Sequence, residues 1–228
     1  LGIALTTTGT NEGIQTSNDG NAITVTEAGS ISTTNTVDKV YGIYNSGDGN
    51  TTTMSGSIST TGDNDTSRQR GYGIYNKGSG NTTIMSGSIS TTGYRAYGIY
   101  NQGSGNTTIM SGSISTTGYR GGVVNYGDDN TTTMSGSIST TGIEGFGIFN
   151  YGDNNTTTVS GSIKTEGEAA HGINIGDNDT SRIRSTGDNN TTTVSGSIKT
   201  EGEGAHGIYN IGDNNTTTIS GTVKATGA

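Results

Sequence analysis

Histidine is the side chain most suited to acid–base chemistry or metal binding in a chain that contains no cysteine. The two histidines, His171 and His206, fall at one position of an internal repeat. Other copies carry an aromatic ring at this position: Tyr41, Tyr72, Tyr97 and Phe146. A metal site or a catalytic base needs convergent partner groups, and no cluster of other ligand residues accompanies these histidines in the sequence. We therefore interpret both as rings that stack from copy to copy, and we predict no catalytic residue and no metal ligand.

Carboxylates recur in a Gly-rich turn of the same repeat, and their spacing raises the question of calcium binding. The turn carries Asp48, Asp128, Asp153, Asp188 and Asp213, with Ser79 and Ser104 in two other copies. Carboxylates on neighbouring strands repel, so a bound Ca²⁺ or solvent screening must offset their charge. Asp is also a common turn residue, and the Gly-rich nonapeptide of calcium-binding β-rolls does not occur. We predict that no cofactor is bound, with Ca²⁺ as the alternative.

Two inserts share the phrase Gly-Asp-Asn-Asp-Thr-Ser-Arg and hold four of the six arginines. Their charged side chains are the candidate interaction residues of the chain: Asp63, Asp65, Arg68, Arg70, Asp177, Asp179, Arg182 and Arg184. The Asp-x-Asp-x-Ser start resembles a calcium loop, but the Gly and Glu that complete such a loop do not follow. Loops on a rigid scaffold commonly carry binding, and corners of a repeat also tolerate plain insertions. The inserts are thus either interaction loops or tolerated insertions.

The elements that position these residues belong to a repeat of about 25 residues. Its anchor, Ser-Gly-Ser-Ile, recurs in closely similar form at Ser55, Ser86, Ser111, Ser135, Ser160, Ser195 and Ser220. The unit has no i, i+3, i+4 apolar spacing, and its Thr, Ser, Gly and Asn residues are poor helix formers. Period-2 alternation fits instead and places Thr83, Met85 and Ile89 on one inward face. A unit with so few apolar residues must stack on its copies to bury them.

We therefore predict an all-β protein, a single parallel β-helix (β-solenoid) of about eight coils with Asn and Ile ladders. The solenoid comprises residues 1–228, with divergent N-terminal coils in 1–41 and inserts at 63–70 and 177–187. The Gly of each anchor, such as Gly87, is expected to face inward at a place that has no room for a Cβ atom.

Asparagine occupies one position in all eight copies, directly after the Gly-rich turn: Asn21, Asn50, Asn81, Asn106, Asn130, Asn155, Asn190 and Asn215. In a parallel stack each side-chain amide can donate to the amide below and accept from the one above, and Asn tolerates a left-handed corner. We expect a structural ladder at this position. A less complete second ladder is expected through Asn45, Asn76, Asn101, Asn125, Asn150 and Asn210.

Composition and charge narrow the function classes. Hydrophobic residues make up 26% of the 228 residues, which is too little for the core of an ordinary globular domain. No apolar run approaches the ~20 residues of a membrane span. The net charge of −8 argues against binding to nucleic acid or to an anionic membrane surface. We predict neither a nucleic-acid partner nor membrane insertion.

Tandem units of the type GIYN-x-GDxNTTTMSGSISTTG resemble the passenger regions of bacterial autotransporters, whose repetitive segments form parallel β-helices on the cell surface. The likeness covers residues 13–228, and similar composition and coil length occur in phage fibres and filamentous adhesins. The resemblance implies an extracellular location at the bacterial cell surface, and adhesion or self-association. The implied partners are further copies of the chain, surface glycans, or the surface of a host or neighbouring cell.

The uniform repeat and the lack of a distinct carboxylate pair predict a non-enzymatic structural or adhesive solenoid, such as a surface fibre or filament subunit. Residues 1–9 and 221–227 both resemble part of a coil, so we expect either that the chain is a piece of a longer solenoid or that copies stack head to tail. Two alternatives are ice binding through an outward Thr-x-Thr array, and carbohydrate binding by an aromatic column. That column comprises Tyr44, Tyr75, Tyr100, Phe149 and Tyr209.

Overall fold

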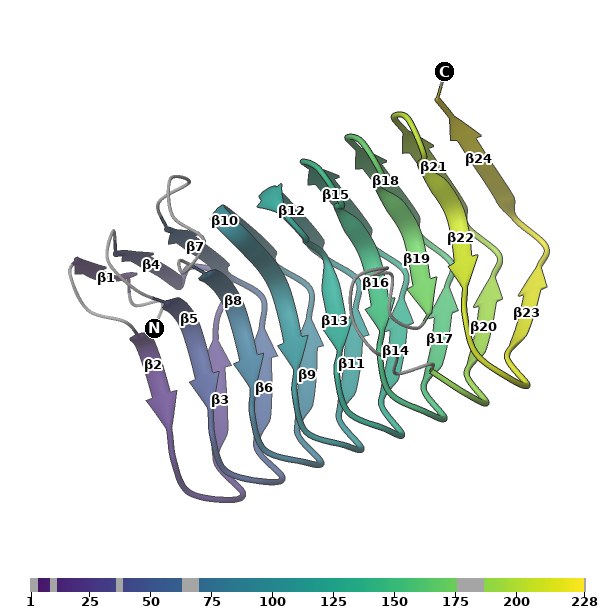
Figure 1. The fold of residues 1–228 in the computed structure, drawn as a ribbon. Helices are drawn as coiled ribbons and strands as arrows, with labels where there is room; N and C mark the ends of the chain where they lie inside the picture. The colour runs from purple at the N-terminus through teal and green to yellow at the C-terminus, as the bar shows by residue number, and fades with distance from the viewer. Residues whose placement is uncertain (1–3, 9–11, 36–38, 63–69, 176–186, 228) are drawn as a thin grey trace.

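The computed structural model describes residues 4–8, 12–35, 39–62, 70–175 and 187–227. Within these ranges every regular element is a β-strand, and the strands wind into a solenoid whose coils follow one another in chain order (Figure 1). Each strand pairs in parallel with its equivalents in the neighbouring coils. The prediction of an all-β, parallel β-solenoid of about eight coils is confirmed.

Each complete coil has three strands, which stack into three columns. The aromatic column consists of β2 (Glu12–Thr16), β5 (Val40–Asn45), β8 (Arg70–Asn76), the second part of β10 (Ser88–Asn101), β13 (Val123–Asn125), β16 (Phe146–Asn150), β19 (His171–Ile175) and β22 (His206–Asn210). The threonine column consists of β3 (Ala22–Val25), β6 (Thr51–Met54), β9 (Thr82–Met85), β11 (Thr107–Met110), β14 (Thr131–Met134), β17 (Thr156–Val159), β20 (Thr191–Val194) and β23 (Thr216–Ile219).

The serine column completes the coil. It consists of β1 (Ala4–Thr8), β4 (Ser30–Thr34), β7 (Ser57–Thr61), the first part of β10, β12 (Ser113–Tyr119), β15 (Ser137–Thr141), β18 (Ser162–Glu166), β21 (Ser197–Glu201) and β24 (Thr222–Thr226). β10 runs through the corner from this column into the aromatic one, with a register shift between Thr92 and Arg95 against the next coil.

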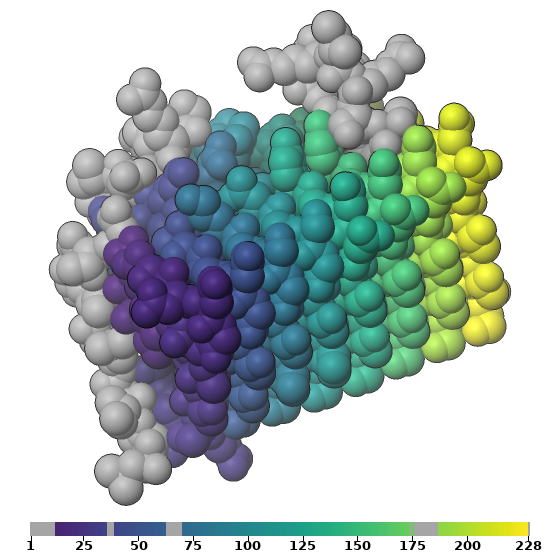
Figure 2. All heavy atoms as spheres, turned by 90° about the horizontal axis from the view of Figure 1, so that it is seen from below, coloured from purple at the N-terminus to yellow at the C-terminus, as the bar shows by residue number. Residues whose placement is uncertain are grey.

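Equivalent positions of the repeat lie side by side along the solenoid. Tyr72 is paired with Tyr97 in the aromatic column, and Met85 with Met110 in the threonine column. In the space-filling view the coils appear as regular bands from the N-terminal to the C-terminal end (Figure 2). Side chains of one kind therefore form ladders parallel to the axis, as expected for in-register parallel stacking.

The core is a narrow channel of side chains to which each coil contributes about three apolar groups. In one coil these are Ile74, Met85 and Ile89, each at most 1% exposed. Burial of such a side chain stabilises the fold by about 1.5–3 kcal/mol. Thr83 is buried with them, whereas the intervening Ile84 faces outward, which confirms the period-2 assignment.

Glycine is needed where backbones approach closely. A Cβ on Gly73 would lie 2.3 Å from Cγ2 of Ile89, so the absence of a side chain lets the Ile pack against the aromatic strand. At the anchor, a Cβ on Gly87 would lie 1.9 Å from the carbonyl oxygen of Gly56. The prediction that this Gly has no room for Cβ is confirmed, but the obstacle is the backbone of the preceding coil. Gly87 itself is half-buried at a corner rather than directed into the interior.

The corner before each ladder Asn is left-handed. The strained position is the residue that precedes the Asn, with φ between 55° and 68°: Gly20, Gly49, Gly80, Gly105, Asp129, Asn154, Asn189 and Asn214. The ladder asparagines themselves have ordinary φ angles. The expected left-handed corner is therefore present one residue earlier than the sequence suggested, at positions that Gly, Asn and Asp tolerate best.

Candidate functional site

The eight asparagines after the turn form the predicted ladder, although its donors differ from the expectation. The backbone N–H of each Asn donates to Oδ1 of the Asn one coil later, at 2.7–2.8 Å from Asn21 through to Asn215. In five of the eight, Asn21, Asn50, Asn106, Asn130 and Asn155, the side-chain Nδ2 donates within its own turn, as from Asn50 to the carbonyl of Gly47. These side chains stabilise coil spacing and turn shape together, and Asn50 is completely buried.

The second ladder is the one that runs from amide to amide. Nδ2 donates to Oδ1 of the next coil at 2.8 Å from Asn45 through Asn76, Asn101 and Asn125 to Asn150. Each Nδ2 also donates to a buried threonine seven residues later, as from Asn101 to Thr108. Ile175 interrupts this ladder, because it stands between Asn150 and Asn210 in the register. Oγ1 of Thr192 in that coil is buried without a hydrogen-bond partner among the described residues.

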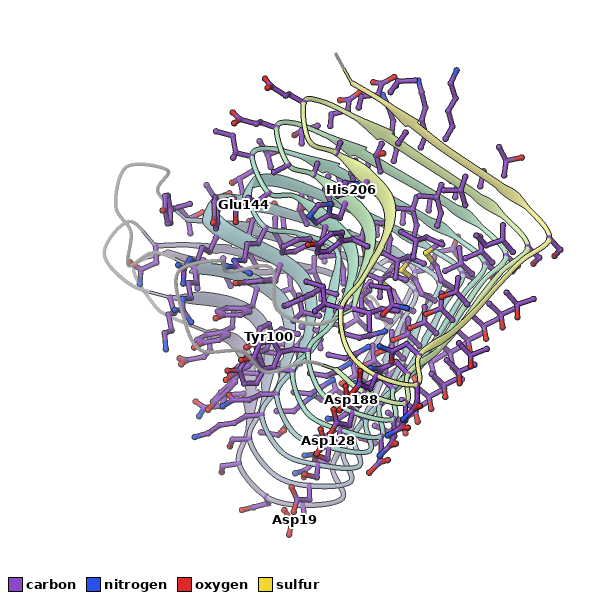
Figure 3. All side chains as sticks on the ribbon, turned by 45° about the vertical axis from the view of Figure 1, so that its right-hand side comes forward. Asp19, Tyr100, Asp128, Glu144, Asp188 and His206 are labelled. Carbon is purple, nitrogen blue, oxygen red and sulfur yellow. The ribbon has the colours of Figure 1, made fainter. Side chains whose placement is uncertain are left out.

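The aspartates of the Gly-rich turn form a third ladder, visible as a line through Asp19, Asp128 and Asp188 at one corner (Figure 3). A carboxylate Oδ1 accepts the backbone N–H of the equivalent residue one coil later, as from Asp153 to Asp128 at 2.9 Å. Backbone donors therefore face these carboxylates, and they reduce the need for a cation. Within the described ranges no group of three or more His, Cys, Asp or Glu side chains is placed to hold a metal ion.

Most of the candidate interaction residues in the inserts lie outside the described residues: Asp63, Asp65, Arg68, Asp177, Asp179, Arg182 and Arg184. Arg70 is the exception and begins β8. Its guanidinium hydrogen-bonds to the hydroxyl of Tyr72, which places it at the edge of the aromatic column. The described residues therefore do not show a site that is formed by both inserts.

The histidines stack as expected. The ring of His171 lies 5.8 Å from that of Phe146 and 5.2 Å from that of His206, and both histidine rings stack on Tyr209. His171 is only 2% exposed. Burial, and then the neighbouring His206, lower the pKa of His171 to about 4, so the ring is neutral at physiological pH.

A groove of about 580 Å³ opens on the outer side of the aromatic column, over β8, β10, β13 and β16. Seven aromatic side chains line it, among them Tyr75, Tyr100 and Tyr126. Figure 3 shows Tyr100 on this side of the solenoid, among other side chains that project away from the core.

The rings of the groove contact one another along the axis. Centroids lie 4.5 Å apart for Tyr126 and Tyr151, with an interplanar angle of 3°, and 5.3 Å apart for Tyr75 and Tyr100, with an angle of 54°. The rings therefore meet one another both face to face and at an angle. The hydroxyl of Tyr75 donates to Oε1 of Gln102, and burial raises the pKa of Tyr75 to about 12.

Four cations line the same groove: Lys39, Arg70, Arg95 and Arg120. No carboxylate is among the described lining residues. The guanidinium of Arg120 lies 5.3 Å from the ring centroid of Tyr119 and 5.6 Å from that of Phe146, within the range of a cation–π contact. Nε of Arg95 is buried and has no hydrogen-bond partner within the described part of the chain.

Sequence reasoning missed this groove. It predicted that the arginines of the inserts would bind a partner, and it considered the aromatic column as rings alone. A signal was present in the phrase Gly-Tyr-Arg, which occurs at residues 93–95 and again at 118–120, directly before the aromatic strand. The stacked rings of Tyr94 and Tyr119 show that the two copies lie next to one another. Arginine at equivalent repeat positions predicts a charged row along the axis, although the register pairs Arg95 with Tyr119, so that Arg120 lies one residue beyond the partner position.

The threonine column presents a second regular surface. Thr51 and Thr53 face outward, with Thr52 and Met54 inward, and the same pattern recurs with strand pairing in register. Outward Thr pairs also occur at 131 and 133, 156 and 158, 191 and 193, and 216 and 218. The exposed Ile84 and Ile109 replace one Thr in two successive coils. The result is a flat, uncharged array with one Thr-rich row per coil.

A comparison with family models finds no match, and comparisons with curated proteins and with solved structures find none either. The class of protein is therefore defined by the fold, a parallel β-solenoid with asparagine ladders. Surface display, a location outside the cell and end-to-end stacking stay predictions that rest on the resemblance to autotransporter passenger regions. In the described part of the chain, no helix has the length and apolar character to cross a membrane.

Proposed function

We propose that the protein is a non-enzymatic adhesive scaffold that binds a polysaccharide in the groove of the aromatic column. The observation that carries the proposal is the groove itself, where tyrosines and arginines from successive coils converge on one side of a uniform rod. Protein sites for carbohydrates combine aromatic surface with hydrogen-bond donors, and a groove along the axis suits an extended polymer. The asparagine ladders hold these coils in register, which pre-organises the site.

The test is a binding screen of the purified chain against immobilised polysaccharides, with variants that remove hydroxyl groups but keep the rings. A Tyr75→Phe/Tyr100→Phe double variant is expected to lose about tenfold in affinity, because each lost hydrogen bond contributes about 0.5–1.5 kcal/mol. Tyr209→Phe changes the same repeat position outside the groove and should bind as the unchanged chain does. Binding that survives the double variant intact, or turnover of a polysaccharide, would contradict the proposal.

A second candidate function is ice binding by the threonine column. The observation that favours it is the in-register, uncharged Thr array, which repeats at the ~4.8 Å strand spacing. Thermal hysteresis and inhibition of ice recrystallisation are the measurements. Thr133→Lys should abolish both effects, whereas Ser139→Lys on the serine column should not, because its neighbour Lys164 already occupies that row. If the unchanged chain has no effect on ice at high micromolar concentration, this candidate is excluded.

A further inference from the structure

We infer that the groove of the aromatic column binds a polyanionic glycan, one that carries carboxylate or sulfate groups, in preference to a neutral glycan. This inference rests on the proposed function and names the chemical class of the ligand. It follows from three features of the groove: its charge, the groups that its rings present, and the repetition of its arginines from coil to coil.

The charge of the groove is opposite to that of the chain. The net charge is −8, with a pI near 4.5, yet Lys39, Arg70, Arg95 and Arg120 gather in one hollow without a carboxylate among the described lining residues. Arg70 and Arg95 are direct partners in the strand register, and like charges in this arrangement destabilise a sheet. Lys164 and Lys199, by contrast, pair with Glu166 and Glu201 on the serine column. An anionic ligand would offset the repulsion within the groove.

The groove carries charged donors beside its aromatic rings. Tyr126 and Tyr151 stack face to face, which reduces the ring surface that these two residues offer to a neutral sugar. The Tyr75 hydroxyl donates to Gln102, whereas the buried Nε of Arg95 lacks a partner among the described residues. Bonds from guanidinium donors to carboxylate or sulfate oxygens are roughly twice as strong as neutral hydrogen bonds. The donor set therefore favours an anion.

The arginines repeat along the axis. Arg70 and Arg95 stand one coil apart, and Arg120 follows in the next coil beside Tyr119. Neighbouring coils are about 4.8 Å apart, which is comparable with the length of one sugar ring in an extended polysaccharide. An acidic polymer that lies along the axis thus meets a cation in each of three successive coils. Single-stranded nucleic acid is less suited, because its bases need free ring faces on which to stack, and Tyr126 and Tyr151 are stacked on one another.

The test uses pairs of polymers that differ only in charge. Affinity of the full chain is measured by calorimetry or biolayer interferometry for dextran sulfate against dextran, and for polygalacturonate against its methyl ester. We expect binding to the charged member of at least one pair to exceed binding to its neutral partner by tenfold or more. The two pairs distinguish sulfate from carboxylate as the preferred anion. Affinity should fall steeply as salt rises from low to near-physiological concentration, because the interaction is between charges.

A matched pair of variants locates the effect. Arg95→Gln removes a cation of the groove and should lower the affinity for the charged polymer about tenfold or more, as expected for loss of a charge-assisted hydrogen bond. Lys224→Gln removes the same unit of charge from the exposed β24 and should leave the affinity unchanged. Circular dichroism and the thermal midpoint show whether each variant is folded, and the salt dependence of the unchanged chain tests the inference without any variant.

Four outcomes separate this inference from the proposed function. Tighter binding to the charged polymers, together with a lower affinity in Arg95→Gln, supports both the inference and the proposed function. Equal affinity for charged and neutral polymers, without salt dependence, overturns the anionic assignment and leaves the proposed polysaccharide function standing. No binding to any of the four polymers overturns both. Tighter binding of an oligothymidylate than of either charged glycan, again lost in Arg95→Gln, assigns the groove to nucleic acid and overturns the inference.

Discussion

The two halves of each coil differ in how much variation they contain. From the ladder Asn to the Ile of the serine column the copies are nearly identical, as in residues 81–89 and 106–114. The aromatic strand and the corners beside it vary in side chain and in length. Tyr72, Tyr97, Phe146 and His171 occupy one row, the first insert precedes this strand, and the second insert follows it. The uniform half contains the first asparagine ladder and the close approach of Gly87 to Gly56. The groove lies in the half where the copies differ.

The largest loss of stability is expected at Gly87, where the uniform half has no space for a side chain. Gly87→Ala places a Cβ against the backbone of Gly56, and neither coil can move without breaking ladder bonds. We expect a loss of more than about 3 kcal/mol in unfolding free energy, measured by thermal or urea unfolding. Gly62→Ala is the control, because its Cβ would have only ordinary contacts, the nearest at 3.5 Å. Equal stability of the two variants would mean that the coils are not so tightly spaced.

The variable half should respond to acid through its buried histidine. The folded state lowers the pKa of His171 to about 4, below the ordinary value of 6.5, so the unfolded chain binds the proton first as the pH falls. Stability is therefore fully present above pH 6.5 and is lost as the pH falls from 6.5 towards 4, by about 3 kcal/mol.

His171→Phe restores the residue of the preceding coil, Phe146, and should remove this part of the acid sensitivity. The comparison of thermal midpoints for the two proteins between pH 7 and pH 4 isolates the contribution of His171 from that of the carboxylates. Parallel midpoint curves for the two proteins would show that the buried ring does not contribute.

A smaller effect distinguishes two threonines at one repeat position. Thr108 accepts a hydrogen bond from Nδ2 of Asn101, whereas Thr192 lies in the coil where Ile175 replaces the Asn. Thr108→Val leaves a buried donor unpaired and should cost about 1–2 kcal/mol. Thr192→Val removes an unpaired hydroxyl at constant shape and should be neutral or slightly stabilising. Denaturant unfolding measures the change in unfolding free energy for each variant. If both variants were destabilised, or both stabilised, the ladder assignment would be contradicted.

The smallest effect concerns the charged rows on the later coils. Lys164 and Glu166 form an exposed ion pair where the preceding coil has Ser139 and Thr141. The double change Lys164→Ser and Glu166→Thr should leave the unfolding midpoint unchanged within error, because exposed ion pairs stabilise little. Light scattering is the complementary measurement, since charges on an exposed strand limit edge-to-edge association. A clear drop in the midpoint would show that this pair belongs to the stabilising part of the coil.

The repeat by itself determined the strand order, the parallel register, the inward Met, Ile and Thr residues, and the positions of both asparagine ladders. In a solenoid the neighbour of a residue is the same residue of the next copy, so a period in the sequence translates directly into contacts in space. That is why Met85 and Ile89 were assigned to the core correctly, and why the stack of His171 on Phe146 was anticipated. Alternation along each strand then indicated which side chains face inward and which face outward.

Only the tertiary structure decided which atoms donate and where a ligand could lie. The amide of Asn50 bonds within its own turn rather than to Asn81, since the left-handed residue before it turns the backbone N–H towards the next coil. The groove depends on the path of the corner after Thr92, which brings Arg95 to the partner position of Arg70. Periodicity does not encode such a path, because a corner is set by local φ and ψ angles and by the packing of rings from several coils.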